Sequence, residues 1–278
     1  MSPFDLLLIP LGFAVGAYGT MIGAGGGFVL VPALLFLFPD DSQKQITSIS
    51  LAVVLATSIS GAAAYAYRRL IDYRTGLILA TAMVPASFAG AYAVRLLPRS
   101  AFDVTFGVLL IVLAAFSVVG VLESGSTIRD PVAARRWTIR RAIERGDGVS
   151  SRYSYDIRHG LGLSAANGFI ATLFGVGGGI IQVPLMVTLL RIPLDVSVAT
   201  SQFMLIFMAA TGTSIHATAG DFGLTELTRA AFLGVGAIAG AQVGAAAAQR
   251  LTGRAIARLL SAGLVAIGLS LILAPALS

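Results

Sequence analysis

A glycine-rich apolar block occurs twice in the chain, as GAGGGFVLVP over residues 23–32 and as GVGGGIIQVP over residues 175–184. Each copy places three consecutive glycines inside a long stretch without charged side chains. A helix that breaks inside a bilayer frees backbone polar groups that lipid cannot satisfy, so such breaks face protein or a water-filled cavity. In transporters, breaks at matching positions of two halves lie at the substrate site. The repeated block therefore predicts a duplicated membrane protein with a binding site at the glycines.

The composition agrees with a membrane protein. The chain is 56% hydrophobic and 12% charged, with a mean hydropathy of +0.88, whereas soluble domains carry about 25% charged residues. Cysteine is absent, which excludes disulfides and thiolate chemistry. No basic region precedes the first apolar run, so we expect no cleaved signal peptide. We expect a multi-pass protein of the cell membrane.

Eight stretches without charged residues are candidates to cross or enter the bilayer. A spanning helix needs about 20 residues, and six of the stretches fit one helix each: 45–67, 75–94, 104–122, 196–220, 230–249 and 259–278. The two stretches with the glycine blocks, 6–39 and 160–190, are too long for one helix and too short for two full ones. Each is best explained as a helical hairpin or a pair of short helices, broken at the glycines.

The two halves of the chain resemble each other beyond the glycine block, which indicates an internal duplication of about 110 residues. The duplication divides the chain into a first transmembrane repeat over 1–122, an arginine-rich linker over 123–158 and a second transmembrane repeat over 159–278. Further matching pairs are Thr47-Ser48 with Thr200-Ser201, Asp72 with Asp221, Ala89-Gly90-Ala91 with Ala239-Gly240-Ala241, and Arg95-Leu96 with Arg250-Leu251.

The distribution of arginine and lysine predicts how the repeats lie in the membrane, because cytoplasmic loops are enriched in these residues. With the linker in the cytoplasm and each glycine-containing stretch returning to its starting side, 15 basic residues lie inside and 4 outside. If each such stretch crosses once, the split is 12 to 7. The first arrangement fits better, and it gives each repeat one hairpin and three spanning helices, so the repeats are inverted and both termini lie outside. The linker arginines are Arg129, Arg135, Arg136, Arg140, Arg141, Arg145, Arg152 and Arg158.

This arginine-rich linker indicates a cytoplasmic loop rather than a nucleic-acid-binding surface. Within residues 133–143, Ala133, Trp137 and Arg141 share one helical face at spacings of four. We expect either a basic helix that lies on the anionic lipid head groups of the cytoplasmic leaflet or a disordered tether.

The glycine blocks are suited to binding an anion. Consecutive backbone N–H groups in a glycine turn bind anions, and a helix that starts after the turn adds the positive end of its dipole. Pro32 or Pro184 follows in each copy, where it would kink or loosen that helix. The alternative is that the glycines only allow close helix packing. Because the block occurs twice we favour a binding site, at Gly25, Gly26, Gly27, Gly177, Gly178 and Gly179.

Neutral polar side chains extend this site. Hydroxyl and amide groups donate hydrogen bonds to an oxyanion without carrying charge. The second half has Gln182 where the first half has Leu30, so a site there is asymmetric. Helix capping and interhelical hydrogen bonding are the alternative roles of each residue taken alone. The predicted side-chain ligands are Thr47, Ser48, Asn167, Gln182, Thr200, Ser201 and Gln202.

Titratable groups are scarce in the predicted spans. No Asp, Glu, Lys or Arg lies deep in a span, although proton and Na⁺ relays usually use an intramembrane carboxylate. His216 is the candidate for proton coupling, with a structural role as the alternative, and its counterpart in the first half is Tyr67. Asp72 and Asp221 occupy matching loop positions, where we expect them to cap the next helix.

Signatures of metal binding and of catalysis are missing from the sequence. A metal site requires His, Asp or Glu clustered at ligand spacing, and the two histidines, His159 and His216, are far apart. The chain has no nucleophile–base pair, P-loop or dinucleotide-binding unit. We therefore expect no enzyme activity, no cofactor and no metal.

The paired GxGGGxxxxP blocks, the Thr-Ser pairs, the later Gly-Asp-Phe (Ile-Asp-Tyr in the first half) and the long central loop resemble the TauE/SafE family of sulfite exporters. This family is also called the toluene sulfonate uptake permease family. The resemblance covers nearly the whole chain apart from the linker. It implies an inner-membrane protein of bacteria or archaea that moves sulfite, sulfonates or related organosulfur anions. The two halves differ at one position of interest: Tyr67 stands where the second half has a histidine, so we expect no role for histidine that both halves share.

These features together predict an all-α polytopic transporter of two inverted repeats. A small sulfur-containing anion would bind between the hairpin tips near the bilayer midplane, and one unit would move against the other to carry it across. Neutral donors suit an anion that must also leave the site. A passive anion channel and a membrane scaffold without a substrate are the alternative functions.

Overall fold

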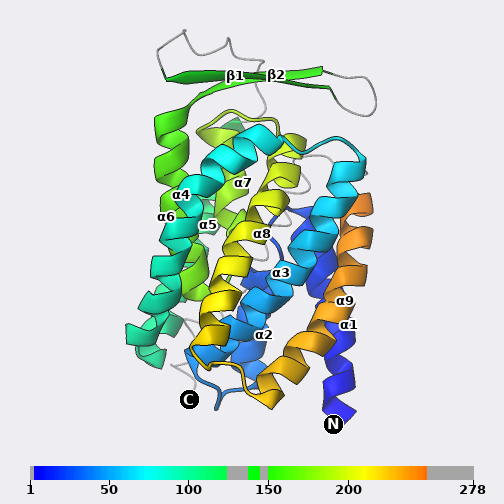
Figure 1. Ribbon diagram of the computed structural model, residues 1–278, viewed down its shortest axis with the longest axis vertical. Helices are drawn as coiled ribbons and strands as arrows, with labels where there is room; N and C mark the ends of the chain where they lie inside the picture. The colour runs from blue at the N-terminus through cyan, green and yellow to red at the C-terminus, as the bar shows by residue number, and fades with distance from the viewer. Residues whose placement is uncertain (1–2, 124–136, 145–149, 249–278) are drawn as a thin grey trace.

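The computed structural model describes residues 3–123, 137–144 and 150–248. The described helices lie side by side in an elongated bundle, and a pair of strands covers one end of it (Figure 1). In chain order the elements are α1 (Pro3–Met21), α2 (Gly27–Leu37), α3 (Gln43–Tyr67), α4 (Tyr73–Ala93), the 3-10 turn η1 (Val94–Leu96), α5 (Arg99–Glu123), β1 (Thr138–Glu144), β2 (Ser150–Asp156), α6 (Ile157–Phe174), α7 (Gly179–Thr188), α8 (Leu194–Thr218) and α9 (Leu224–Ala248).

Four of the described helices are long and apolar enough to cross a membrane: α3, α4 with its extension η1, α8 and α9. At about 1.5 Å per residue, a helix of this length exceeds the roughly 30 Å of a hydrocarbon core. α5 covers the predicted span 104–122, and the predicted span 259–278 lies outside the described residues. The expected all-α polytopic membrane architecture is confirmed.

Each glycine block lies where the chain reverses inside the bundle. α1 runs from the end that carries the N-terminus to the middle, and α2 returns to that end (Figure 1). α6 starts beneath the strands, and α7 returns toward them. With 11 and 10 residues, α2 and α7 are too short to cross a bilayer. Of the two arrangements expected from the sequence, the structure has helical hairpins.

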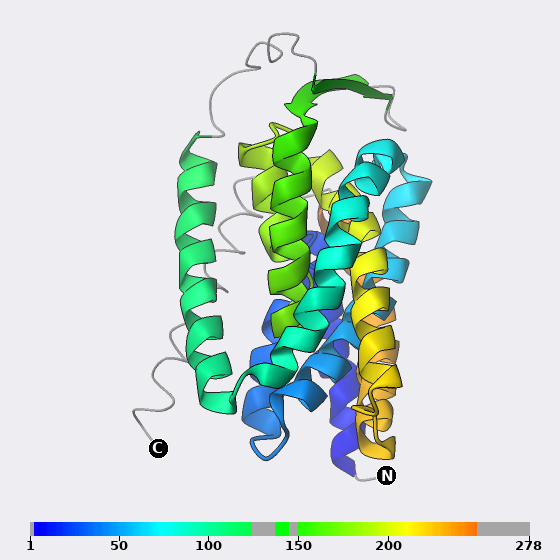
Figure 2. The same cartoon turned by 60° about the vertical axis from the view of Figure 1, so that its left-hand side comes forward.

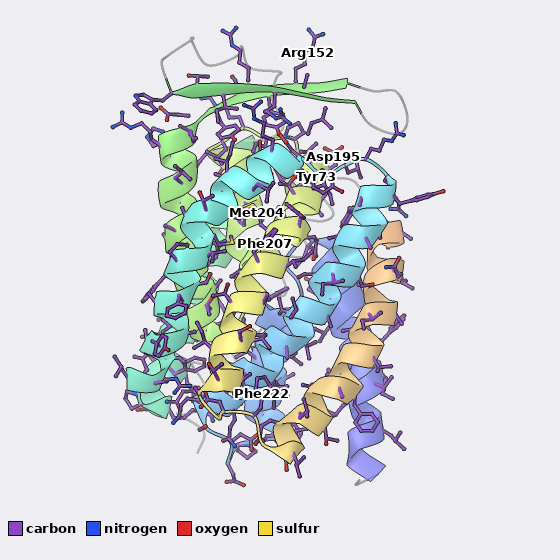
Figure 3. All side chains as sticks on the ribbon, in the orientation of Figure 1. Tyr73, Arg152, Asp195, Met204, Phe207 and Phe222 are labelled. Atoms are coloured by element: carbon purple, nitrogen blue, oxygen red, sulfur yellow. The ribbon has the colours of Figure 1, made fainter. Side chains whose placement is uncertain are left out.

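The long helices of the two halves run in opposite directions. We call the end of the bundle beneath β1 and β2 the strand end. α3 leads toward the strand end and α4 leads away from it (Figure 2). α8 starts near Asp195 at the strand end and finishes close to Phe222 at the opposite end, and α9 leads back (Figure 3). α3 and α8 therefore run in opposite directions, and so do α4 and α9 (Figure 2 and Figure 3).

Glycines bring helices of different halves into close contact. The most extensive helix packing joins α1 to α9 and α4 to α6. A Cβ atom added to Gly16 of α1 or to Gly240 of α9 would collide with a carbonyl group of the other helix. At the second contact, a Cβ atom on Gly168 would lie 3.0 Å from the Ser87 hydroxyl oxygen and would collide with the Met83 carbonyl oxygen. Small residues at these positions allow backbones to approach as membrane helices require.

The backbone shows which residues of the two halves correspond. Arg69 in the loop after α3 and Gly220 in the loop after α8 both have positive φ angles, of 55° and 77°. Leu70, which follows Arg69, donates its N–H group to the carbonyl oxygen of Tyr65 over 3.2 Å. Asp221, which follows Gly220, donates its N–H group to the carbonyl oxygen of His216 over 3.0 Å. Tyr65 is therefore the counterpart of His216, and the sequence-based match with Tyr67 was wrong by two residues.

The linker forms a β-hairpin in place of the expected helix or tether. β1 and β2 pair antiparallel, with Ile139 opposite Tyr155 and Arg141 opposite Tyr153. Alternate residues of β1 face the bundle, because Ile143 is buried and Arg141 is partly buried, while Arg140 and Ala142 are exposed. On β2, Tyr153 and Tyr155 are buried and Arg152 is exposed (Figure 3). This two-residue period overrides the four-residue spacing that suggested a helix. The remaining linker arginines Arg129, Arg135, Arg136 and Arg145 lie outside the described residues.

Candidate functional site

The two glycine blocks contact each other in the interior of the bundle. We call residues 23–27 the first tip and residues 175–179 the second tip. A Cβ atom on Gly27 would lie 2.6 Å from the carbonyl oxygen of Gly175, and one on Gly179 would collide with the backbone of Gly23. All residues of both tips are buried. Only glycine fits where the two hairpins touch. Gly27 and Gly179 therefore allow close packing, which was the alternative role considered from the sequence.

Backbone N–H groups at both tips lack an acceptor among the described residues. α2 starts at Gly27 and α7 at Gly179, and the first N–H groups of a helix have no intrahelical partner. Gly25 differs, because it donates to the carbonyl oxygen of Gly19 over 3.2 Å. The free N–H groups belong to Gly26 and Gly27 of the first tip and Phe28 directly after it, and to Gly177, Gly178 and Gly179 of the second tip and Ile180 directly after it.

The electrostatics of the two tips favour an anion. Both α2 and α7 direct the positive end of the helix dipole to the place where the tips meet. The uncharged stretches 6–39 and 160–190 contain both tips, so no carboxylate of the hairpins neutralises this potential. Buried N–H groups without an acceptor are costly, and a bound oxyanion would satisfy several of them at once.

Two predicted amide side chains gather at the second tip. Asn167 on α6 donates from Nδ2 to Oε1 of Gln182 on α7 over 2.9 Å, and Gln182 donates to the Ser164 hydroxyl oxygen over 3.2 Å. All three side chains are buried, and the Asn167 Oδ1 atom has no partner among the described residues. The Asn167 Nδ2 atom lies 2.8 Å from where a Cβ atom of Gly178 would be. The structure thus brings Asn167, Gln182 and Gly178 together.

Two predicted residues of α8 contact the first hairpin. Ser201 donates to the carbonyl oxygen of Gly23 over 3.0 Å, and Gln202 donates to that of Gly19 over 3.4 Å. In the other half, Ser50 makes the bond that corresponds to that of Ser201, to the carbonyl oxygen of Gly175 over 2.6 Å. Ser50 and Ser201 are therefore structural counterparts, and the sequence match of the two Thr-Ser pairs was wrong.

Sequence reasoning missed two hydroxyls beside the first tip. The Thr20 hydroxyl oxygen and the Gln202 Oε1 atom lie 3.2 and 3.3 Å from where a Cβ atom of Gly61 would be. The Ser58 hydroxyl oxygen lies 3.5 Å from the corresponding position on Gly25. All three oxygens are buried and have no partner among the described residues. Thr20 had a detectable signal, because a threonine precedes the first glycine of each tip by three residues, as Thr20 and as Thr172.

Three other predicted ligands use their hydroxyl groups elsewhere. Thr47 donates to the carbonyl oxygen of Gln43 over 2.8 Å, and Ser48 donates to that of Gln45 over 2.7 Å, both within α3. The Thr200 hydroxyl oxygen accepts the N–H of Asp72 over 3.0 Å. In this conformation these hydroxyls are not directed to the tips.

His216 belongs to an ion-pair cluster at the end of the bundle opposite the strands. Its Nδ1 atom lies 2.7 Å from Oδ2 of Asp221, and Arg95 pairs with the same carboxylate. His216 is fully buried and its Nε2 atom has no partner among the described residues. Asp221 does not cap α9 as expected, because Glu226 accepts the N–H of Gly223 over 2.8 Å instead. The other expected cap is present, since the Asp72 side chain accepts the N–H of Thr75 at the start of α4 over 3.1 Å.

Comparison with known proteins places this architecture in a family. The sequence profile described as Sulfite exporter TauE/SafE matches residues 8–271. The chain belongs to the TauE/SafE family. The expected resemblance is confirmed, and the match covers nearly the whole chain.

Relatives of the TauE/SafE family carry transporter names. The chain is 32% identical over 273 residues to Probable membrane transporter protein YunE of Bacillus subtilis, covering 96% of this chain and 97% of the relative. It is 25% identical over 283 residues to a probable membrane transporter protein of Methanocaldococcus jannaschii, covering 96% and 97%. No solved structure matches the chain significantly. The family and these names indicate a multi-pass membrane transporter.

Proposed function

We propose that the protein is a secondary transporter that moves sulfite or an organosulfonate across the cytoplasmic membrane by alternating access. The observation that carries this proposal is the meeting of two buried helix N-termini whose N–H groups have no acceptor among the described residues. Such a site favours negative charge. The matched family is described by sulfite export, which agrees with a small oxyanion as substrate.

The substrate would bind where the two tips meet. N–H groups of both tips would hold the oxyanion, with Asn167 and Gln182 on one side and Ser58, Thr20 and Gln202 on the other. These groups are neutral, so binding is weaker than to a buried arginine and release remains fast. Because Gln182 has an apolar counterpart in the first half, the second tip would supply more of the side-chain hydrogen bonds.

The opposite directions of α3 and α8 support two inverted repeats with the strand end in the cytoplasm. The count of 15 basic residues against 4 gives the same orientation. Arg140 and Arg152 are exposed on the β-hairpin, where they would contact anionic lipid head groups. The tips are buried, so the hairpins must separate to admit a substrate, and this favours a carrier over a passive channel.

Transport into proteoliposomes tests this function. The assay measures uptake of labelled sulfite and of ethanesulfonate, each challenged by the other, with and without a pH gradient. A carrier gives saturable uptake with counterflow, and the order of competition identifies the preferred anion. Uptake that never saturates would establish a channel instead. Absence of both uptake and ligand-dependent thermal stabilisation would favour a scaffold.

Gly178→Val tests the position of the site. Gly178 has right-handed φ and ψ angles that valine can adopt. The valine Cβ atom would lie 2.8 Å from Asn167 Nδ2 and 3.1 Å from Met208 Sδ, so the substitution must displace the Asn167 amide. The matched control is Gly162→Val on α6, because no atom lies within 4 Å of a Cβ atom there. We expect Gly178→Val to abolish transport while membrane insertion survives. Wild-type flux in that variant would contradict the assignment of the site.

A further inference from the structure

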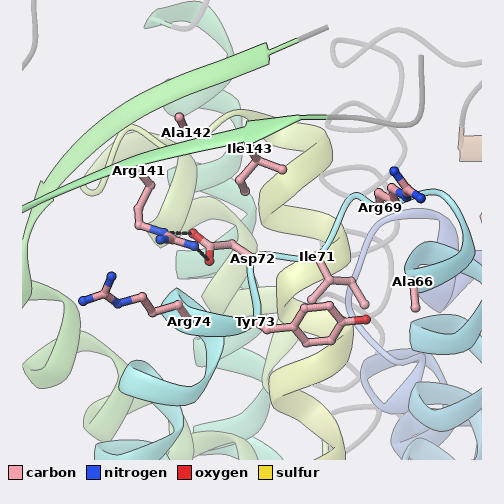
Figure 4. Close-up of a pocket in the computed structure, with 9 residues that line it drawn as sticks. All are labelled: Ala66, Arg69, Ile71, Asp72, Tyr73, Arg74, Arg141, Ala142 and Ile143. Carbon is pink, nitrogen blue, oxygen red and sulfur yellow. Dashed lines mark hydrogen bonds and ion pairs between the residues drawn. The ribbon is translucent and has the colours of Figure 1, made fainter. Parts of the chain in front are cut away.

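Asp72 at the strand end is buried and accepts hydrogen bonds from two different parts of the chain. Arg141 of β1 donates to both carboxylate oxygens, from Nε over 2.9 Å and from Nη2 over 2.7 Å (Figure 4). The Tyr153 hydroxyl of β2 donates to the same group. At the start of α4, Thr75 donates both its N–H and its hydroxyl, over 3.1 and 2.7 Å. We call these contacts of Asp72 with Arg141 and Tyr153 the latch.

The carboxylate of the latch is ionised at neutral pH. Burial by itself raises the pKa of Asp72, but hydrogen bonds from Arg141, Tyr153 and Thr75 outweigh it and lower the pKa from 3.8 to about 2. Burial and the adjacent carboxylate raise the pKa of the Tyr153 hydroxyl, so it remains a donor. The latch is therefore a charged, hydrogen-bonded group of three residues that helps to hold the β-hairpin on the bundle, together with the hydrogen bond from the Tyr155 hydroxyl to that of Thr75 over 3.2 Å.

A cavity of about 420 Å³ opens beside the latch, between β1 and the loop that follows α3. Besides Arg141, two exposed arginines line it, Arg69 and Arg74, and the guanidinium group of neither forms a hydrogen bond or an ion pair within the described part of the chain. Asp72 is the one carboxylate among the lining residues, so the cavity carries an excess of positive charge. The remaining lining residues are Ala66, Ile71, Tyr73, Ala142 and Ile143 (Figure 4).

The latch is connected to the first tip through α8. The Asp72 N–H group donates to the Thr200 hydroxyl oxygen over 3.0 Å. The next residue, Ser201, donates to the carbonyl oxygen of Gly23 in the first tip over 3.0 Å. A displacement at the cavity can therefore reach the tips through two adjacent residues of one helix.

We propose that this cavity is a second anion-binding site, a vestibule in which a sulfonate or sulfate-type anion takes the place of Asp72 on Arg141 and releases the β-hairpin. The inference rests on the proposed function, because it gives the transported anion its path from the strand end to the tips. It also assigns the β-hairpin a role as the lid of that path.

A sulfonate can replace the carboxylate of Asp72 on Arg141 without a change in the number of charges or of paired hydrogen bonds at the guanidinium group. A guanidinium group binds carboxylate and sulfonate oxygens with the same paired N–H geometry. The positive charges of Arg69 and Arg74, which do not pair with Asp72, would attract the incoming anion in addition. After release, Asp72 keeps the two hydrogen bonds from Thr75 and stays at the N-terminus of α4, where the helix dipole favours its charge.

Spin labels can measure the release of the lid directly, because the chain contains no cysteine. Cysteines replacing Tyr67 on α3 and Arg152 on β2 place labels at exposed sites that do not line the cavity. The distance distribution between them is recorded in detergent at increasing ethanesulfonate, with sodium chloride of equal ionic strength as the control. We expect a second, longer distance whose population grows saturably with ethanesulfonate and not with chloride.

Two variants separate the parts of the proposal. Asp72→Asn keeps a good helix cap and should show the longer distance without any anion. Arg74→Gln should raise the half-maximal ethanesulfonate concentration about fivefold, as expected for one nearby exposed charge. Arg191→Gln is the matched control, because it removes an exposed arginine of the same end that does not line the cavity. An equal effect of Arg74→Gln and Arg191→Gln would overturn the site.

A lipid source of the anion is tested in nanodiscs without ethanesulfonate. If phosphatidylglycerol discs produce the longer distance and phosphatidylcholine discs do not, the cavity binds lipid head groups and the vestibule is refuted. An unchanged distance at saturating ethanesulfonate refutes it as well. Gly178→Val separates this inference from the proposed function, because it should lose flux and keep the distance change. A distance change in a wild-type protein without flux would refute transport and leave the vestibule standing.

Discussion

Gly27→Ala should separate the two tips with a single methyl group. The added Cβ atom would lie 2.6 Å from the carbonyl oxygens of both Gly175 and Val176, and 2.5 Å from the carbonyl carbon of Val176. Ordinary C···O contacts are about 3.3 Å and ordinary C···C contacts are about 3.5 Å or longer, so the tips must move apart by about 1 Å. All of these are backbone atoms of a buried contact, and no side-chain rotation relieves the overlap.

Overpacking of this kind costs about 1–3 kcal/mol. At about 1.4 kcal/mol per factor of ten, the closed arrangement of the tips becomes roughly 5- to 150-fold less favourable. We expect flux in proteoliposomes to fall at least about fivefold and the melting temperature of the purified protein to fall with it. The φ angle of Gly27 is not positive, so the effect reports on space and not on backbone conformation.

Gly162→Ala is the matched control for this prediction. It adds the same methyl group to α6 in the second hairpin, where no atom lies within 4 Å of the added Cβ atom. A glycine-to-alanine change inside a helix is worth up to about 1 kcal/mol in favour of the helix, so flux and melting temperature should be unchanged or slightly higher. Equal flux in Gly27→Ala and Gly162→Ala would refute the requirement for contact between the tips.

Three further predictions concern the latch, the second tip and the distant cluster. The pKa of Asp72 is lowered in the folded protein, so its carboxylate contributes about 2 kcal/mol to the free energy of unfolding above pH 4. This contribution is lost as the pH falls toward 2. The fluorescence of Trp137, the single tryptophan, should change over that pH range in the wild-type protein and stay constant in Asp72→Asn. Gln182→Leu leaves the Asn167 amide without its acceptor, a loss of about 1–3 kcal/mol, and should reduce flux of ethanesulfonate more than membrane insertion. If His216 couples transport to protons, His216→Gln removes the stimulation of uptake by a pH gradient and preserves counterflow; stimulation equal to wild type would assign His216 a structural role.

The sequence was sufficient to predict the glycine hairpins and the membrane architecture. Three consecutive glycines in an uncharged stretch of intermediate length have few solutions in a bilayer, because lipid satisfies no backbone group. The amides Asn167 and Gln182 were also predictable, since few polar side chains occur in the hairpins. These properties depend on residue type and position along the chain alone.

The remaining features depend on which atoms meet in space. A hydroxyl can donate to its own helix, as those of Thr47 and Ser48 do, or lie unpaired beside a tip, as that of Ser58 does among the described residues, and the sequence does not distinguish these cases. The β-hairpin was missed because Ile139, Arg141 and Ile143 alternate over too few residues to outweigh a helical pattern. The match of His216 with Tyr67 was wrong because it was based on similar residue types in the two loops. The backbone hydrogen bonds of these loops instead pair His216 with Tyr65.

The glycine-lined contact between α1 and α9 also constrains how the chain is made. Roughly 200 residues separate Met21 at the end of α1 from Leu224 at the start of α9. At a synthesis rate of about 5–20 residues per second, α9 is made roughly 10–40 s after α1. During that interval the narrow glycine face of α1 is open to other helices and to proteolytic surveillance. A ribosome that stalls within the second half would therefore release a chain with an orphaned first helix, which is the kind of defect that membrane quality control can recognise.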